Sequence, residues 1–396
     1  MTVPRRCIAA PPAETDDHVL VAGFVTPSGA ARRLLALRLV AAFALGPALA
    51  SAAQPPPSMA ATPAEPGQTP AEIVPERSEL LTGIGVPRGR FRFQWQNDSW
   101  LTESDRFYTN GIGLGWTLED GTLSQGLENL LHWLPFTPED RSGTATELFV
   151  RQDMFTPEDF TNPALVLDDR PYAGWLHLDI EHQVLTLRRD RRDDRLDTWE
   201  LQLGIVGPSA LAEQAQREVH ELVSAPEPRG WDNQLEDEPG IVLGYHRQFR
   251  AYYDPHALGP IEADFIGRYG ARVGNVETSA RIGGVLRAGF GLPRHFGTAM
   301  RGDAPGVRYR HRIYAAAGVS GKVVLRNIFL DGNTFSSSHS VDRNPLVAQF
   351  HVGLHWEPCS RARVSIAEFF STAEFDSPSQ EGDLGHFTSV QLELFF

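Results

Sequence analysis

The chain ends in SVQLELFF, residues 389–396, a stretch in which apolar and polar side chains alternate. Every second residue from Val390 to Phe396 is apolar, and the residues between them up to Glu393 are polar. The stretch FRFQWQ, residues 91–96, has the same period of two. Because successive side chains of a strand point to opposite faces, this period predicts strands with one apolar and one polar face.

The N-terminal part predicts export. Arg32 and Arg33 precede the largely apolar run 34–50, and small residues follow it, as in a secretory signal peptide. The apolar run after Arg38 is about a dozen residues long, shorter than the roughly 20 that a membrane anchor needs. We therefore expect an N-terminal extension and signal peptide over 1–53, a disordered Pro/Ala-rich linker over 54–85, and one folded domain over 86–396.

Composition argues against two classes of site. The formal net charge is -14, whereas a nucleic-acid surface needs a basic stripe, so we expect no nucleic-acid partner. Cys7 and Cys359 are the only cysteines in the sequence. A disulfide framework and a thiolate metal cluster are therefore not expected.

Export together with amphipathic strands predicts an all-β fold, a twelve-stranded antiparallel transmembrane β-barrel with a short extracellular-side helix. A secreted β-sandwich would alternate too, but the terminal Phe396 resembles the C-terminal signature of substrates of the barrel assembly machinery. Segment 311–331 is kept as one strand, because a single-chain bacterial barrel has an even number of strands. The expected strands lie near 90–98, 107–117, 146–154, 172–187, 195–206, 240–252, 261–273, 279–289, 311–331, 346–357, 361–371 and 386–396.

In such a barrel the connections alternate between the two ends. If both termini are periplasmic, the connections that face outside the cell are 99–106, 155–171, 207–239, 274–278, 332–345 and 372–385. The third of these contains a predicted amphipathic helix, 209–223, with Ser209 as its cap. Gln216 and His220 are four residues apart, so they share one face of that helix. A surface histidine beside a surface glutamine is the alternative explanation.

Five polar segments resemble the lipid A 3′-O-deacylase family. They are Gln96-Asn97-Asp98, Phe107-Tyr108-Thr109-Asn110-Gly111, Gln152 to Pro157, Asp168 to Trp175, and Gly204 to Gln234. The resemblance implies an outer-membrane barrel that requires calcium and removes the acyl chains at the 3′ position of lipid A, so its partners would be lipopolysaccharide and the outer membrane. The family's active-site residues fall on Asn97, Asp98, Thr109, Gln216 and His220.

Two positions depart from the family pattern. A lysine of the second outer loop has no counterpart in 155–171, where the nearest cation is Arg170. An acidic residue expected after the helix falls near Pro226, with Glu227 one position further on. These departures concern the substrate more than the type of reaction.

The residue types suit ester hydrolysis. Neutral His220 can take a proton from water, and Gln216 can orient the ring or the water. Asp98 supplies a hard oxygen ligand for Ca²⁺ with Asn97 beside it, and bound calcium would polarise the ester carbonyl. Thr109 is a candidate to hydrogen-bond substrate or water, or to act as a nucleophile.

Two alternatives remain open from the sequence. One is a porin-like or structural barrel with no enzymatic activity. The other is an outer-membrane phospholipase that uses a serine nucleophile. Ser209 is the serine on the helical segment, but it lies eleven residues before His220, which disfavours pairing within one helix.

Overall fold

The computed structural model describes residues 89–98, 110–118, 126–127, 129–130, 141–188, 191–297, 311–377 and 384–396. The expected signal peptide over 1–53, the expected linker over 54–85 and Thr109 lie outside these described residues.

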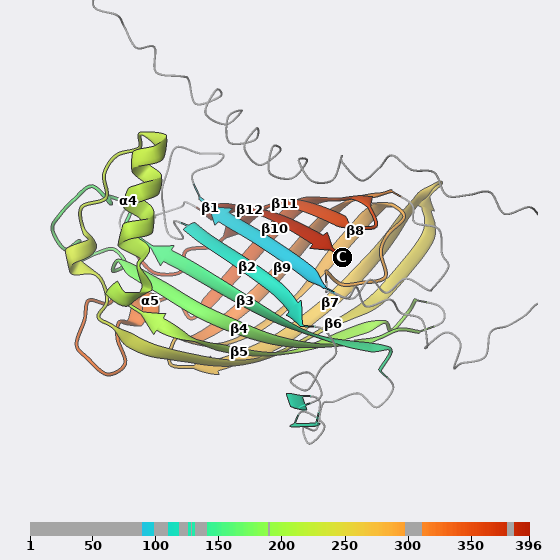
Figure 1. The fold of residues 1–396 in the computed structure, drawn as a ribbon, viewed down its shortest axis with the longest axis horizontal. Helices are drawn as coiled ribbons and strands as arrows, with labels where there is room; N and C mark the ends of the chain where they lie inside the picture. Colours follow the sequence, from blue (N-terminus) through green and yellow to red (C-terminus); the bar gives the residue numbers. More distant parts are fainter. Residues whose placement is uncertain are drawn as a thin grey trace, which may run out of the picture. The chain divides into compact units, whose positions relative to one another are not determined.

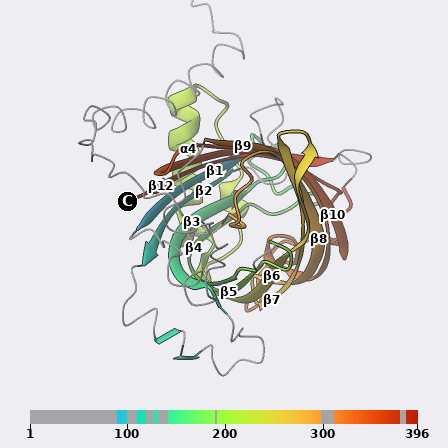
Figure 2. The same ribbon diagram turned by 90° about the vertical axis from the view of Figure 1, so that its right-hand side faces the viewer.

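Twelve strands form one closed antiparallel barrel, in which each strand pairs with its neighbours in sequence and β1 pairs with β12 (Figures 1 and 2). The strands are β1 (Arg90–Asn97), β2 (Asn110–Leu118), β3 (Gly143–Phe155), β4 (Ala173–Thr186), β5 (Arg195–Val206), β6 (Glu238–Leu258), β7 (Ile261–Gly274), β8 (Glu277–Phe290), β9 (Arg312–Asn327), β10 (Leu346–Cys359), β11 (Ala362–Ser371) and β12 (Gly385–Phe395). The predicted fold class and strand count are confirmed. A helix that could cross a membrane by its length and apolarity does not occur in the described part of the chain.

The strand boundaries differ from the prediction mainly at three places. β9 is one strand, as parity required, but its predicted last residues form the short helix α5 (Ile328–Asp331). β6 runs to Leu258, past the predicted end at 252. The described part of β2 begins at Asn110, later than the predicted start at 107.

The two faces of the wall differ in chemistry. On β2 the outward side chains of Ile112, Leu114 and Trp116 are 44 %, 51 % and 49 % exposed. On the inner face Arg90 is fully buried, with ion pairs to Glu147 and, at 3.0 Å, to Glu393. Since apolar side chains stay exposed outside while charged ones are paired inside, the outer surface suits lipid and the lumen suits polar groups.

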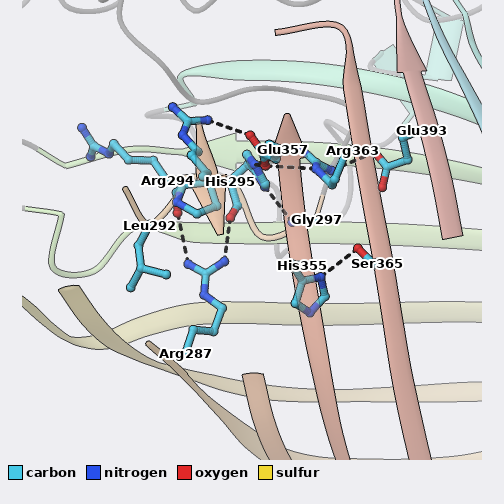
Figure 3. Close-up of polar contacts among 12 residues, drawn as sticks. Arg287, Leu292, Arg294, His295, Gly297, His355, Glu357, Arg363, Ser365 and Glu393 are labelled. Carbon is cyan, nitrogen blue, oxygen red and sulfur yellow. Dashed lines mark hydrogen bonds and ion pairs between the residues drawn. The ribbon is translucent and has the colours of Figure 1, made fainter. Parts of the chain in front are cut away.

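The connection after β8 turns into the lumen. Residues 291–297 are here called the plug. Their carbonyl groups accept hydrogen bonds from inward-facing arginines of several strands, and the plug's His295 bonds a glutamate. Figure 3 shows the part of this network around Arg287 and His295. These wall residues are Arg90 of β1, Arg250 of β6, Arg287 of β8 and Glu357 of β10. Because they lie around the circumference of the barrel, the plug crosses the lumen.

The chain enters and leaves the barrel at the same rim, because Arg90 pairs with Phe395. The opposite rim, here called the outer rim, holds the end of β1 and the connection between β5 and β6 (Figure 1). That connection contains η2 (Pro208–Ala210), α4 (Ala212–Val223) and η3 (Trp231–Asn233). The predicted sorting of connections, with a short helix among those of the outer rim, is confirmed.

Candidate active site at the outer rim

Helix α4 begins later than the sequence predicted, at Ala212. Ser209 lies in the preceding turn η2, and its hydroxyl donates to Asp237 Oδ2 at 2.6 Å. Leu211 separates the two helical segments with a left-handed φ of 60°. Ser209 is therefore not the cap of α4. The prediction was wrong because the hydroxyl is engaged by a residue 28 positions later, which a local pattern does not reveal.

The first turn of α4 packs on the outward face of the barrel wall. Met154 of β3 lies on the same face as Val150, whose side chain is 53 % exposed, and pairs with Gly174 of β4. A Cβ on Gly174 would stand 2.7 Å from the Cβ of Ala212. Met154, Ala212 and Trp231 form one buried apolar cluster. The helix is thus fixed against the lipid-facing side of the wall.

Gln216 lies one turn further along α4 and is 2 % exposed. Its Oε1 accepts a hydrogen bond from the indole Nε1 of Trp231 at 2.8 Å. Its Nε2 is buried and has no hydrogen-bond partner among the described residues. The side chain therefore points toward the wall, with one end of its amide satisfied.

His220 lies near the end of α4 and is partly exposed. Its Nδ1 is 2.6 Å from the carbonyl oxygen of Pro226, and the ring of Phe160 stands edge-on to it with centroids 5.4 Å apart. A carbonyl can only accept, so Nδ1 carries the proton and Nε2 of the neutral ring is an acceptor. The ring is oriented by Pro226. Gln216 makes no hydrogen bond to this ring within the described residues, and its other predicted role, in orienting the water, stays a prediction.

Asn97 and Asp98 lie where β1 ends at the outer rim. Asn97 pairs with Asn110, two residues before the outward-facing Ile112, and Asn110 pairs with Met154. With neighbouring strands about 4.8 Å apart, Asn97 is roughly 10 Å along the wall from the residue that anchors α4. Asp98 is 1 % exposed. The register brings the end of β1 and helix α4 to the same part of the outward face.

Of the five predicted site residues, four lie at this rim, namely Asn97, Asp98, Gln216 and His220. Thr109 belongs to the part of the chain that is not described. Clusters of three or more His, Cys, Asp or Glu side chains suited to a metal do not occur in the described residues. The carboxylate of Asp98 and the amide oxygen of Asn97 are hard oxygen donors of the kind calcium prefers. The donor chemistry therefore fits calcium, with the remaining ligands coming from outside this pair.

The structure explains one departure from the family pattern. Arg170 is 1 % exposed, and its Nη2 lies 3.0 Å from Glu374 Oε2. Its guanidinium also lies near the rings of Phe155 and Phe375, at 5.8 Å and 5.2 Å. Burial opposes ionisation of Glu374, but Arg170 outweighs it and holds the pKa of Glu374 below its ordinary value. Arg170 thus ties two outer loops together and does not replace the missing lysine.

The second departure lies beside His220. Glu227 pairs with Arg217 at 3.7 Å and with Arg229 at 3.5 Å, and its side chain is 58 % exposed. The neighbouring Pro226 supplies the acceptor for His220 through its main-chain carbonyl. In this chain a neutral carbonyl therefore orients the imidazole.

Sequence reasoning did not assign a role in the candidate site to Trp231, Tyr172 or Phe160. The Tyr172 hydroxyl donates to the Phe160 carbonyl at 2.8 Å, and the rings of Tyr172 and Trp231 lie 5.0 Å apart. Gly230 permits this contact, since a Cβ there would stand 2.3 Å from the Tyr172 ring. The signal was present in the motifs Gly230-Trp231 and Pro171-Tyr172, but their partners are distant in sequence.

Three comparisons place the chain among known proteins. The family model described as "Outer membrane protein LpxR" matches residues 39–396. The structure of LpxR from Salmonella typhimurium is similar, with a TM-score of 0.60 and 18 % identity, over 78 % of this chain and 100 % of that chain. The translocator domain of the autotransporter NalP from Neisseria meningitidis has a TM-score of 0.34 and 12 % identity, over 81 % of this chain and 92 % of that chain. No curated protein matches.

The family match spans the whole described barrel and both parts of the candidate site, the end of β1 and helix α4. The Salmonella structure has the same fold. The chain is therefore an outer-membrane protein that belongs to the LpxR family, the lipid A deacylase family that its polar segments resemble.

Proposed function

We propose that this protein hydrolyses the acyl ester at the 3′ position of lipid A in the outer leaflet of the outer membrane, with calcium as cofactor. The observation that carries the proposal is the orientation of His220. Its Nδ1 donates to the Pro226 carbonyl at 2.6 Å, so Nε2 is the basic atom of the ring. Family membership supports the lipid A substrate.

The position of the helix supports a substrate that arrives through the membrane. α4 packs on the outward wall, and its second half presents Val219, Leu222 and Val223, which are 44 %, 85 % and 51 % exposed. These side chains form an exposed apolar surface on the second half of the helix. Acyl chains of the outer leaflet would meet this surface, with their ester groups near the polar end of the strands.

The reaction is an addition of water followed by loss of the sugar oxygen. His220 Nε2 accepts a proton as the water oxygen bonds to the acyl carbon, and the carbonyl oxygen becomes negative. Re-formation of the carbonyl breaks the bond to the sugar oxygen, which takes the proton back from His220. The products are a free fatty acid and a sugar hydroxyl group.

Asp98 and Asn97 would hold the calcium ion. When bound, calcium would supply a positive charge that polarises the ester carbonyl. The carboxylate of Asp98, 1 % exposed, is the anionic part of this donor set. The amide of Asn97 would add a neutral oxygen.

The two alternatives find less support. A serine mechanism would need Ser209 next to a base, but its hydroxyl donates to Asp237 in a turn that precedes α4. An open pore would need a clear lumen, but the plug crosses it and is held by Arg287 and Arg250 at 3.1 Å and 2.8 Å. A hydrolase on the outer face of the wall requires neither.

Mass spectrometry of lipid A from cells that express the chain tests the proposal. The wild type should produce lipid A that lacks the 3′ acyl mass, and His220→Ala should lower the rate by at least about 10²-fold. His256→Ala is the matched control, because His256 is an exposed histidine outside the outer rim. Unchanged lipid A with correctly inserted wild type would refute the function, and an active His220→Ala would refute the role of His220.

A further inference from the structure

The amide of Gln216 has only one chemically sensible orientation. An indole N–H can donate but cannot accept, so the atom 2.8 Å from Trp231 Nε1 has to be the amide oxygen. The Nε2 of Gln216 then points away from Trp231. Both side chains are almost fully buried, at 1 % exposed for Trp231 and 2 % for Gln216.

The amide nitrogen of Gln216 carries two N–H groups that can donate hydrogen bonds. Gln216 Nε2 is buried and lacks a hydrogen-bond partner among the described residues. Buried donors are nearly always bonded in folded proteins, and an exception calls for an explanation such as a bound ligand. His220 is not that partner, because its Nδ1 bonds Pro226 and no bond joins its ring to Gln216. The unmade bonds therefore point to a substrate acceptor.

Trp231 is itself held firmly. Its ring lies 5.0 Å from that of Tyr172, and it belongs to the cluster with Met154 and Ala212. The main chain around it forms the turn η3, in which Gln234 N donates to the Trp231 carbonyl at 3.1 Å. A fixed indole fixes the amide that accepts from it.

We propose that Trp231 is a positioning residue that holds Gln216 as a hydrogen-bond donor toward the acyl carbonyl oxygen of the substrate. This inference rests on the proposed function. Gln216 Nε2 donates to that oxygen as negative charge develops on it, and Trp231 prevents the amide from presenting its own oxygen, which would repel the charge. Gln216 acts neither as a base nor as the group that orients His220.

Isosteric changes at Gln216 test the donor role through kcat and KM on lipid A in detergent micelles. Gln216→Glu keeps an oxygen for Trp231 but removes both N–H donors. It should lower kcat by about 10²- to 10³-fold, as loss of an oxyanion donor does, and leave KM within about twofold. Near wild-type kcat for Gln216→Glu would overturn the inference.

Trp231→Phe tests the positioning role, with Trp199→Phe, at a buried tryptophan on the outward face of β5, as the control for lost ring volume. Trp231→Phe should lower kcat about tenfold, because only a fraction of the amides keep the donor orientation, whereas Trp199→Phe should not. In a Gln216→Met background Trp231→Phe should have no further effect. An equal loss in that background would show that Trp231 acts through packing alone and overturn its role.

A spectroscopic readout is independent of activity. In ¹H–¹⁵N spectra of the refolded barrel, Gln216→Met should shift the indole N–H signal of Trp231, and Gln216→Glu should keep it hydrogen-bonded. An indole signal that does not respond to Gln216→Met would overturn the proposed bond.

If the wild type has no activity on lipid A, the proposed function fails. If the wild type and Gln216→Glu are both active, only the donor role of Gln216 is refuted, and the proposed function stands.

Discussion

Gly174→Ala should impair activity by displacing helix α4 while leaving the barrel closed. The new Cβ would stand 2.7 Å from the Cβ of Ala212 and 3.0 Å from that of Ala210. Carbon atoms in contact normally lie about 3.5–4.0 Å apart, so the start of α4 has to move by roughly 1 Å. A displacement of about 1 Å at a catalytic group can reduce the rate by about 10²-fold, which corresponds to about 2.7 kcal/mol of transition-state stabilisation.

The assay is the initial rate of fatty-acid release from lipid A micelles, with heat-modifiable gel mobility as the measure of barrel assembly. Ala212→Gly removes the methyl group that Gly174→Ala would meet, so the double variant should regain at least tenfold of the lost rate. Gly321→Ala is the control, because its new Cβ would have nothing within 4 Å. A fully active Gly174→Ala, or a double variant that is no more active than Gly174→Ala, would show that the docking of α4 on the wall does not determine the activity of the protein.

Three further predictions concern the metal, the plug and the last strand. Asp98→Asn should raise the calcium concentration needed for half-maximal activity, and Asp98→Ala should be inactive. Superimposable calcium titrations of the wild type and Asp98→Asn would contradict the assignment of Asp98 as a calcium ligand. Burial, and after it the Arg363 guanidinium, hold the pKa of His295 below its ordinary value. The neutral form of His295 therefore stabilises the plug above pH 6.5. This stabilisation is lost as the pH falls from 6.5 toward the lowered pKa. Planar-bilayer conductance should therefore rise between pH 6.5 and 4, and less so in His295→Gln; a pH-independent trace would exclude this. Deletion of 386–396 should expose the edges of β1 and β11 and prevent insertion, so a heat-modifiable outer-membrane species from this deletion would be evidence against it.

Much of the barrel could be predicted from local sequence, since each strand carries its own pattern. The alternation at 91–96 and 389–396 predicted β1 and β12, and the structure pairs Phe91 with Leu394. Parity kept 311–331 as one strand and placed the connection 207–239 at the outer rim. The residue types of the candidate site were found through the resemblance to a family.

The contacts that shape the site could not be predicted in the same way. Ser209 looked like a helix cap, but Asp237, 28 residues later, bonds its hydroxyl. Gln216 and His220 looked like partners because they are four residues apart, but each bonds elsewhere, to Trp231 and Pro226. The hydrogen-bond partner of each side chain depends on which groups the fold brings near it.

The sequence by itself determined the number of strands, the face that each side chain occupies and the rim that holds each connection, because a period of two is a property of neighbouring residues. Only the tertiary structure decided that α4 packs on the lipid-facing wall at Gly174, that Trp231 fixes the amide of Gln216, and that the plug crosses the lumen. These features depend on hydrogen bonds and close contacts between residues far apart in sequence. Closure of the barrel creates that proximity, and no local pattern encodes it.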